Sequence, residues 1–383
     1  MNASLSLSMA AGKSNYSLGR VQTPALGMIC RRYLDNRDFI AKPYYLLQLR
    51  TTKAGKELVL TCTGKYDTPE KLDVDRKKVY EETTAKVVQV EKKEVPEEAP
   101  LLYDLTALQR SANTKLGLTA EQTLNIAQKL YEGVEVGKEM VGLITYMRTD
   151  SIRLSDEFIK NAKEYIIDKY GEKYYKGEKK ASKGKNIQDA HEAIRPTDIR
   201  RTPESVKKSL TLEEYKIYSL IYNRAIASLM SDAILEDTKV DVENQGYLFN
   251  LSGEITLFDG FKTIYEEASL VDEEEDLTRL PELKIGEVLE FSEITKEQKF
   301  TSPPYRYTEA RLIRKMEELG IGRPSTYALT METLRARAYV TMDKRAFVPT
   351  SQGILTTEQL ELFFSSIINC LLYTSPSPRD TER

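Results

Sequence analysis

The sequence predicts an α+β protein of several domains, in which helical parts are separated by β-rich segments. One observation is the length, because 383 residues are enough for two or three domains. Another is the composition, because 40% hydrophobic and 30% charged residues suit globular units with their own cores. The third is the alternation of patterns. Residues 44–95 and 238–296 are rich in β-branched and aromatic residues, whereas residues 101–235 and those from 301 have helical patterns.

Residues 1–40 are predicted to form a turn and then a helix, because Gly19 precedes the helical stretch 21–34. Strands follow in the first β-rich segment, where Gly-Lys and Asp-Thr-Pro sequences separate the runs of β-branched and aromatic residues. The predicted strands are residues 44–52, 57–63 and 84–90. Pro96 and Pro100 mark the end of this segment.

The middle of the chain is predicted to be mainly helical. Residues 119–122 (TAEQ) form a capping box at the start of one helix, and Gly133 stands where its C-terminal cap belongs. Ser155 opens another helix, with acidic residues in its first turn. Between these helices, residues 142–146 are predicted to form a short strand. Residues 171–187 are rich in Lys and Gly and are predicted to form a basic loop.

Strand patterns return in the second β-rich segment. They include Val240 and residues 247–251, 255–258 and 288–291. The acidic run 272–276 between them is predicted to be a solvated loop. We expect the two β-rich segments to pair into one domain that interrupts the helical parts.

The C-terminal part is predicted to follow a winged-helix plan. One helix has an apolar face formed by Leu312, Ile313, Met316 and Leu319. Residues 320–322 (GIG) break that helix, Pro324 opens the next, and residues 339–348 form a hairpin. The order of helix, glycine turn, helix and hairpin is typical of a winged helix. Residues 103–147 follow a similar plan with a turn at Gly117, so we predict two such units.

Charge is distributed unevenly along the chain, although the net charge is only −3. Residues 1–50 hold seven Lys and Arg against two Asp and Glu, and residues 299–347 hold ten against five. Residues 236–298 hold five against eighteen. This pattern suits a basic face that binds a polyanion, with an acidic region elsewhere. Ordinary solvated faces would also explain it, so charge alone leaves both interpretations open.

Several classes of protein are not favoured. No stretch approaches the ~20 apolar residues that a membrane span needs, and the first residues lack the pattern of a secretory signal. Cys30, Cys62 and Cys370 are far apart and form no CxxC pair, so neither a zinc site nor a disulfide framework is expected. We expect a reducing cytoplasm as the compartment.

Tyr146 is the first candidate for chemistry, because Arg148 follows it in a polar turn that also contains Thr149 and Asp150. Phenol hydroxyls ionise only near pH 10, so a tyrosine nucleophile needs a group that favours the phenolate. A nearby guanidinium can do so, and it can also stabilise the charge of a phosphoryl transition state. An ordinary strand tyrosine beside a surface arginine remains an alternative at this point.

The single histidine, His191, is the second candidate. It precedes Arg195 by four residues, so the two would share one face if this segment were a helix. An imidazole and a guanidinium on one face would suit a phosphate site. A surface helix end is the alternative.

Five blocks in this order resemble the signature blocks of type IA DNA topoisomerases. They are residues 17–24 (SLGRVQTP), 100–109 (PLLYDLTALQ), 142–151 (GLITYMRTDS), 191–197 (HEAIRPT), and 308–310 (TEA) followed by 320–328 (GIGRPSTYA). The resemblance runs from about residue 2 to 360. The forms GRVQTP and LYDLT are more similar to the topoisomerase III branch, whereas the Tyr-Met-Arg form is shared with topoisomerase I.

The resemblance implies a toroid with two winged-helix-containing domains and a β-rich arch that acts as a hinge. It divides the chain into a first part of domain IV and two parts of arch domain II around catalytic domain III, followed by a second part of domain IV. The expected bounds are residues 1–40, 41–98, 99–236, 237–299 and 300–364. Residues 365–383 resemble a non-native tail more than a protein segment, and we exclude them from the fold.

The resemblance also implies roles for residues. Tyr146 matches the nucleophile that cuts one strand and holds its 5′ phosphate, Arg148 matches the arginine of that motif, and His191 joins them as a catalytic residue. Arg195 matches a phosphate-contacting helix, and Arg20 and Gln22 match a block beside a single-strand groove. The remaining residues expected to contact DNA are Thr149, Asp150, Arg323, Ser325 and Thr326.

The family's metal-binding Toprim domain is expected before the first block, yet only eighteen residues precede Gly19. We therefore expect a fragment that is inactive alone. Mg²⁺ is expected for the full-length enzyme with its site absent from this chain, and no ATP is expected. The implied partner is DNA, preferably single-stranded, and the implied state is a monomer that does not act at membranes.

Two other functions are alternatives. A tyrosine recombinase also uses Tyr, Arg and His on DNA, but it places its nucleophile after a His-x-x-Arg pair, whereas Tyr146 precedes His191. A non-catalytic winged-helix protein that binds single-stranded DNA is the second alternative. Covalent attachment of DNA would separate these functions.

Overall fold

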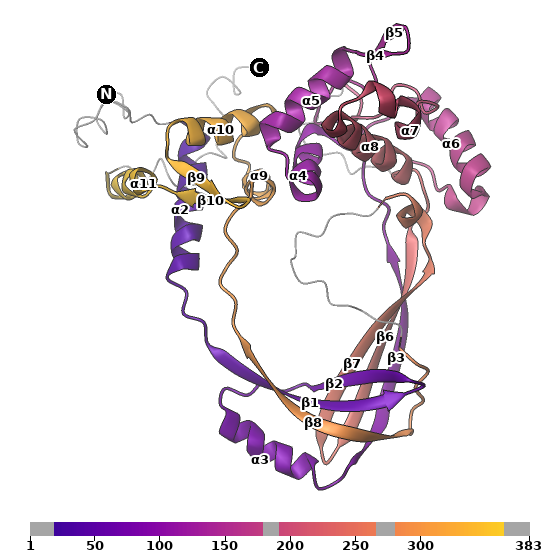
Figure 1. Ribbon diagram of the computed structural model, residues 1–383, viewed down its shortest axis with the longest axis vertical. Coiled ribbons are helices and arrows are strands. Elements are labelled where there is room, and N and C mark those ends of the chain that lie inside the picture. The colour runs from indigo at the N-terminus through magenta and orange to yellow at the C-terminus, as the bar shows by residue number, and fades with distance from the viewer. Residues whose placement is uncertain (1–18, 179–190, 266–279, 364–383) are drawn as a thin grey trace, which may run out of the picture.

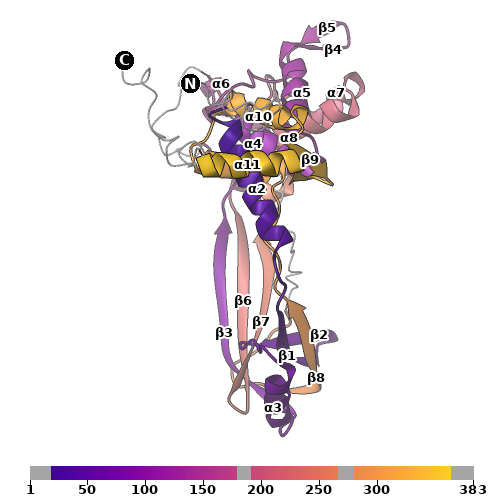
Figure 2. The same ribbon diagram turned by 90° about the vertical axis from the view of Figure 1, so that its left-hand side faces the viewer.

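The computed structural model describes residues 19–178, 191–265 and 280–363, and the elements form a ring (Figure 1). Helices lie at one end of the ring and a strand barrel at the other, and the chain runs between them along two sides. The view turned by 90° shows that the ring is narrow (Figure 2). This shape agrees with the toroid that the sequence resemblance implies. No helix among these residues combines the length and the apolar character needed to cross a membrane.

Six strands close into a barrel in the order β1-β2-β7-β6-β3-β8, with every neighbouring pair antiparallel. The strands are β1 (Pro43–Lys53), β2 (Lys56–Cys62), β3 (Thr84–Glu97), β6 (Ala233–Asn244), β7 (Tyr247–Phe258) and β8 (Val288–Phe300). Strand β3 pairs with β6 along most of its length, and β1 pairs with β8. The predicted pairing of the two β-rich segments is therefore confirmed.

Alternate side chains of these strands point into the barrel, as the two-residue period of a strand requires. The core contains Leu47, Leu49, Leu60, Val242 and Phe249. Helix α3 (Pro69–Val79) covers one end and buries Leu72 and Val79. Strand signals alone did not predict this helix, although Pro69 occupies the first helical turn that proline favours.

One helical unit is built from the two ends of the described chain. It contains α2 (Gln22–Arg37), α9 (Glu309–Glu318), α10 (Pro324–Ala336), β9 (Val340–Asp343), β10 (Ala346–Pro349) and α11 (Ser351–Phe363). The predicted first helix and the C-terminal hairpin are confirmed. The core holds the predicted apolar face of α9, with Leu312, Ile313 and Met316 fully buried. We call this part the flanking unit.

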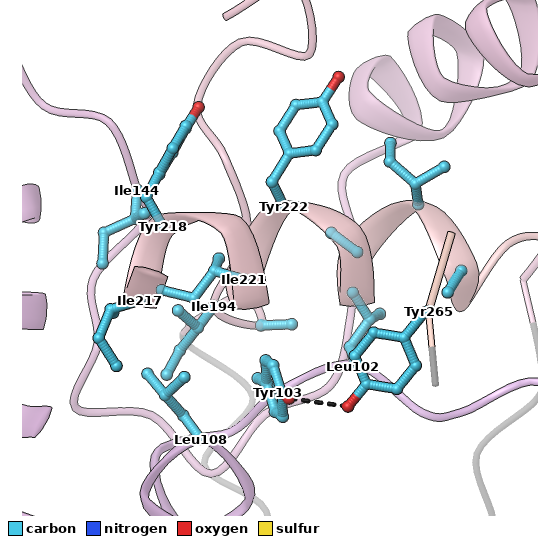
Figure 3. Close-up of a cluster of buried hydrophobic side chains, with 14 of the residues drawn as sticks. Leu102, Tyr103, Leu108, Ile144, Ile194, Ile217, Tyr218, Ile221, Tyr222 and Tyr265 are labelled. Atoms are coloured by element: carbon cyan, nitrogen blue, oxygen red, sulfur yellow. Dashed lines mark hydrogen bonds between the residues drawn. The ribbon is translucent and has the colours of Figure 1, made fainter. Parts of the chain in front are cut away.

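The other helical unit, which we call the tyrosine unit, is continuous in sequence except for residues 179–190. It contains α4 (Leu105–Leu116), α5 (Ala120–Glu132), β4 (Val134–Val136), β5 (Glu139–Val141), α6 (Asp156–Tyr170), η1 (Glu172–Tyr174), α7 (Pro203–Val206), η2 (Lys207–Ser209) and α8 (Leu212–Ala227). Figure 3 shows its core around α8, including the hydrogen bond between the Tyr103 and Tyr265 hydroxyls, 2.9 Å long. The predicted capping box at Thr119 and the caps at Gly117, Gly133 and Ser155 are confirmed.

Two local predictions in this unit are wrong. Residues 142–146 do not form a strand, because the hairpin β4–β5 comes earlier and Ile144 makes only an isolated bridge, to Pro196. Residues 191–195 do not form a helix either. The Ile194 N–H donates to Tyr103 O and the Arg195 carbonyl accepts from Thr145 N, so this backbone is bonded to other segments instead.

Some predictions fall outside the described residues. The basic loop is described only up to residue 178, and the acidic run 272–276 and the tail 365–383 are not described. The helix η3 (Gly260–Thr263) follows strand β7 in the chain and precedes the acidic run in sequence. The division into domains stays a prediction.

Candidate active site

The segment that carries Tyr146 is an extended stretch of backbone held against residues 193–197. The Thr145 N–H donates to Arg195 O at 3.0 Å, and the Thr145 hydroxyl donates to Ala193 O at 2.6 Å. In return the Arg195 N–H donates to the Thr145 hydroxyl oxygen at 3.0 Å. Thr145 therefore fixes the position of its neighbour Tyr146 relative to the segment that begins at His191.

Gly142 sets where this stretch leaves helix α5. A Cβ atom on Gly142 would lie 2.6 Å from Tyr131 O, closer than a side chain can approach a carbonyl. The next residue, Leu143, donates its N–H to Leu130 O at 2.7 Å. Glycine is therefore required for the backbone to turn closely past the end of α5.

Tyr146 lies between two other rings. Its side chain is 36% exposed, whereas its neighbours Ile144 and Met147 are buried. The His191 ring centroid lies 5.2 Å from that of Tyr146, and the Tyr131 ring meets Tyr146 edge-on at 5.5 Å. The structure thus brings together two residues predicted as catalytic, 45 positions apart in sequence, and leaves the phenol open to a partner from solvent.

Arg148 is exposed and almost without partners. Its only hydrogen bond among the described residues is a long one, 3.4 Å, to Gln128 Oε1. A guanidinium that is not committed to a carboxylate keeps its donors for an anionic ligand. Tyr146 and Arg148 lie on either side of buried Met147, in the same turn.

Thr149 and Asp150 differ in accessibility. Thr149 is 3% exposed, its carbonyl accepts from Leu105 N, and its hydroxyl accepts from Ser151 N. Asp150 is exposed. The Thr149 side chain thus shapes the turn, whereas Asp150 is open to solvent.

Arg195 is committed to partners within the chain. Its guanidinium pairs with Glu192, with Nε 2.8 Å from Oε2, and it also donates to Ser155 Oγ at 3.2 Å. The guanidinium carbon lies 4.7 Å above the ring of Phe158. Arg195 therefore ties the 193–197 segment to the start of α6 and does not point freely to a ligand.

The other residues predicted to contact DNA gather in the flanking unit. Arg20 and Gln22 lie at the start of α2, and the Gln22 oxygen accepts from Arg337 at 3.1 Å. A Cβ on Gly322 would come within 3.0 Å of Val21, so the GIGRPST loop lies against the same place. The structure thus brings the residue 17–24 and 320–328 blocks together.

At that loop, the Arg323 N–H and carbonyl both bond the Thr326 hydroxyl, at 2.9 Å each. Ser325 and the Arg323 side chain are exposed at the start of α10. Backbone N–H groups at a helix start, together with a nearby arginine, favour an anion.

The two helical units meet along α4, α5, α9 and α10. Glu309, 1% exposed, accepts from Ala120 N at 2.6 Å at the start of α5, and it also pairs with Arg335 of α10. Arg110 and Glu317 make an exposed ion pair across the same contact. These contacts fix the flanking unit beside the tyrosine unit.

Asp104 lies close to this junction and caps α4, accepting from Ala107 N at 2.7 Å. Burial, together with the charges of Glu317 and Asp150, raises the pKa of the Asp104 carboxyl to about 6, while the hydrogen bond from Ala107 N and the charge of Arg110 oppose the rise. The tyrosine unit therefore contains a carboxyl group that titrates near neutral pH.

Three contributors were missed from the sequence. Thr145 and Gly142 act through the backbone, and their roles depend on segments that sequence spacing does not bring together. The apolar pattern of α5 included Tyr131 as a partly apolar position, but it did not indicate that the Tyr131 ring would lie against Tyr146. Within the described ranges, no three His, Cys, Asp or Glu side chains are grouped as a metal site would require.

Comparison with known proteins places these observations in a family. A family model described as DNA topoisomerase matches residues 1–373. DNA topoisomerase 1 of Rickettsia typhi is 40% identical over 366 residues, which cover 92% of this chain and 47% of that protein. DNA topoisomerase 1 of Rickettsia felis is 41% identical over 365 residues, with the same shares covered.

A solved structure agrees. Full-length topoisomerase I from Thermotoga maritima superposes with a TM-score of 0.83 at 30% identity, covering 97% of this chain and 60% of that chain. The chain spans about half the length of the curated relatives it matches. The ring fold, the ordered blocks and these matches together show that the chain belongs to the type IA DNA topoisomerase family.

Proposed function

We propose that this chain carries the strand-cutting site of an ATP-independent DNA topoisomerase, with Tyr146 as the nucleophile. The observation that carries the proposal is the exposed phenol of Tyr146, 5.2 Å from His191 between ring centroids and two residues from a nearly uncommitted Arg148. A tyrosine with an accessible side chain, a histidine ring beside it and an arginine two residues away suits attack on a phosphodiester.

In the proposed reaction, the Tyr146 oxygen bonds to phosphorus in one DNA strand. The bond from that phosphorus to the 3′ oxygen breaks, so the 5′ phosphate stays on the tyrosine. The proton lost by the phenol balances the proton gained by the departing 3′ hydroxyl. After another strand has passed through the gap, the 3′ hydroxyl attacks the phosphotyrosine and restores the original bond, so no ATP is consumed.

The neighbouring residues are assigned roles by their positions. Arg148 stabilises the charge that develops on the phosphoryl oxygens, and His191 contacts the same phosphate. Arg195 positions the His191 segment through Glu192 and Ser155, and it would reach a phosphate only by giving up those bonds. Thr149 supports the turn, and Asp150 faces the strand.

A DNA path leads from this site to the flanking unit. We assign the contacts there to Arg20, Gln22, Arg323, Ser325 and Thr326; the exposed Arg20 and Arg323 and the start of α10 support the assignment. We also assign both helix–turn–helix–hairpin units to the winged-helix class. Single-stranded DNA is the preferred partner, because a cut strand must leave its duplex to reach a phenol fixed by backbone bonds.

The remaining proposals concern the whole enzyme. The forms GRVQTP and LYDLT favour the topoisomerase III branch, whereas the curated relatives are named DNA topoisomerase 1. We propose a monomer that works in the reducing cytoplasm, in keeping with the free, buried Cys30 and Cys62. A non-catalytic protein that binds single-stranded DNA is the second candidate, favoured by the exposed basic residues of the flanking unit.

Covalent capture of DNA separates the two candidates. Because the chain spans about half of its relatives, it is tested alone and joined to the segments of the Rickettsia typhi enzyme that it does not cover. Strands labelled at the 3′ end are incubated with each protein in magnesium buffer, and labelled protein is sought on a denaturing gel. Label at the 3′ end is needed because the strand bound through its 5′ phosphate stays attached.

The expected result is capture by the joined protein and none by its Tyr146→Phe variant, which lacks only the attacking oxygen. Tyr131→Phe is the matched control, since Tyr131 lies against the same ring but is not the nucleophile. Peptide mapping should place the label on Tyr146. Capture by Tyr146→Phe would mean that another residue attacks DNA, and binding without capture by any form would favour the second candidate.

A further inference from the structure

A pocket lies between α6, α7 and α8, and none of its lining residues belongs to the candidate active site. Its volume is about 320 Å³. That is near the lower end of the range for small-ligand sites, about 300–1,000 Å³. The pocket is therefore large enough for a ligand of modest size rather than for a few water molecules.

Aromatic and aliphatic side chains form the floor of the pocket. Tyr222 and Ile226 of α8 are 3% and 0% exposed, and Pro203 is also buried. The rings of Tyr165 and Tyr222 meet at 90° with centroids 6.5 Å apart. Figure 3 shows the Tyr222 ring on the side of the helix opposite to Tyr103. A flat apolar group can stack against such a floor.

The rim of the pocket carries a cation. Lys169 is exposed, its Nζ donates to the Tyr165 hydroxyl at 2.9 Å, and it lies 5.3 Å from the centroids of both Tyr165 and Tyr170. No ion pair of Lys169 occurs among the residues that the structure describes. Glu204, the carboxylate on the rim, accepts from the Tyr215 hydroxyl at 3.4 Å instead.

The wall of the pocket carries an amide. Asn223 is half-buried on α8, next to Tyr222, and its side chain makes no hydrogen bond within the described part of the chain. An amide offers one acceptor and two donors, the combination that recognises the edge of a nucleobase. Within one pocket there are thus an aromatic floor, an amide on the wall and an ammonium group at the mouth.

We propose that this pocket binds one nucleotide. The base lies against the tyrosine rings, the Asn223 amide pairs with the edge of the base, and Lys169 binds the phosphate at the rim. Base–aromatic stacking and a positive charge beside it are the general means by which proteins hold single-stranded nucleic acid. The nucleotide is either free in solution or a unit of a DNA strand, and both share this chemistry.

Titration of the 383-residue chain by calorimetry tests the proposal. The ligands are deoxyadenosine monophosphate, deoxyadenosine, inorganic phosphate and a six-residue deoxyadenylate strand. Lys169→Met removes the cation, and Asn223→Leu removes the amide and fills its space. Lys163→Met is the matched control, because Lys163 is on the same helix but lies 5.5 Å from the ring centroid of Tyr175, outside the pocket.

The two variants are expected to differ in whether they weaken the binding of deoxyadenosine. Lys169→Met weakens the monophosphate at least tenfold and leaves deoxyadenosine unchanged, whereas Asn223→Leu weakens both. Lys163→Met stays within twofold of the unchanged chain, and Glu204→Gln tightens the monophosphate by removing a repelling charge. Inorganic phosphate binds at least tenfold more weakly than the monophosphate.

The six-residue deoxyadenylate distinguishes a free nucleotide from a unit of a DNA strand as the ligand of the pocket. If the hexanucleotide binds more tightly than the monophosphate and loses affinity in Lys169→Met, the pocket takes a unit of a strand; equal or weaker binding assigns it to free nucleotides. The proposal is overturned if no ligand binds, or if Lys169→Met and Lys163→Met behave alike for every ligand. Melting curves verify that each variant is folded. None of these outcomes depends on Tyr146, so the result is independent of covalent capture.

Discussion

The tyrosine unit and the flanking unit repeat one local plan but differ beyond their hairpins. In each, a first helix is capped by a side chain, from Asp104 or Thr308, and is followed by a glycine with positive φ, 72° at Gly117 and 68° at Gly320. A second helix and a two-stranded hairpin come next, β4–β5 in one unit and β9–β10 in the other.

After its hairpin, the flanking unit returns to a helix. Helix α11 begins at Ser351, and Gly353 lies so close to Tyr339 that a Cβ would come within 2.2 Å of the Tyr339 carbonyl oxygen. Tyr339 itself is 1% exposed. In the tyrosine unit the chain stays extended and presents Tyr146. The comparison teaches that the helices and hairpin are a shared scaffold, and that the two units differ in the segment that follows it: a helix in one, and an extended segment that exposes Tyr146 in the other.

The largest effect is expected where the two units touch. Glu309→Ala should destabilise the contact by about 3–5 kcal/mol, because it leaves the Ala120 N–H and the Arg335 guanidinium without their buried partner. Native-state hydrogen exchange at the start of α5 would measure this loss. Glu317→Ala breaks the exposed pair across the same contact and should cost no more than ~1 kcal/mol. Equal losses would mean that the units are not held together by the buried group.

The next effect concerns the exposed segment itself. Arg148→Ala should slow covalent capture by about 10²–10³-fold, because one positioned donor to the transition state is lost. Arg148→Lys should be intermediate, since an ammonium cannot offer a planar pair of donors. Single-turnover capture rates measure both. A normal rate in Arg148→Ala would show that the turn presents Tyr146 without help from its arginine.

A smaller effect is expected in the cap of the tyrosine unit. The Asp104 pKa is about 6 in the folded chain, against 3.8 as its ordinary value, so the folded state favours the protonated carboxyl. The stability that this group contributes is therefore complete below about pH 4 and is lost as the pH rises to about 6. Asp104→Asn keeps a capping side chain and removes the charge. It should stabilise the chain at pH 7.5 by on the order of 1–3 kcal/mol and change little near pH 3.5.

Denaturant unfolding at both pH values is the measurement for Asp104→Asn. Asp198→Asn is the control with the opposite sign, because the hydrogen bond from Arg200 lowers the pKa of Asp198. An Asp104→Asn chain whose stability follows the same pH profile as the unchanged chain would contradict the assignment.

The smallest effect is expected in the flanking unit. Arg323→Gln should weaken binding of single-stranded DNA modestly and reduce the slope of log affinity against log salt by about 0.7, the value for one phosphate contact. Arg314→Gln is the control, because Arg314 pairs with Glu318 on α9. Identical slopes for Arg323→Gln and the unchanged chain would remove Arg323 from the DNA path.

Local signals predicted much of the fold. The capping residues Thr119 and Ser155, the breaks at Gly117 and Gly133 and the C-terminal hairpin all act through neighbours a few residues away, so the sequence carries them directly. The pairing of the two β-rich segments was also predictable, because strands rich in β-branched residues need partners.

The site was less predictable because its geometry depends on distant backbone bonds. The strand predicted at 142–146 and the helix predicted at 191–195 were both wrong, since the two segments satisfy their N–H and carbonyl groups on each other and on Tyr103. The closeness of Tyr146 and His191 could be expected only from family resemblance. Nothing in the sequence spacing indicated that the Arg195 guanidinium would form an ion pair with Glu192.

The pairing of β1 with β8 also has a consequence for how the chain reaches its fold. Gln48 and Glu297 are hydrogen-bonded at 2.8 Å although 249 residues separate them. During synthesis the chain emerges from its N-terminus, so the β1–β2 hairpin exists long before its neighbour has been made. Contacts between such distant positions slow folding, because a long loop must close before they form. The β1–β2 hairpin therefore keeps an open strand edge until β8 has been made, and during that interval edge-to-edge association with other chains is a hazard.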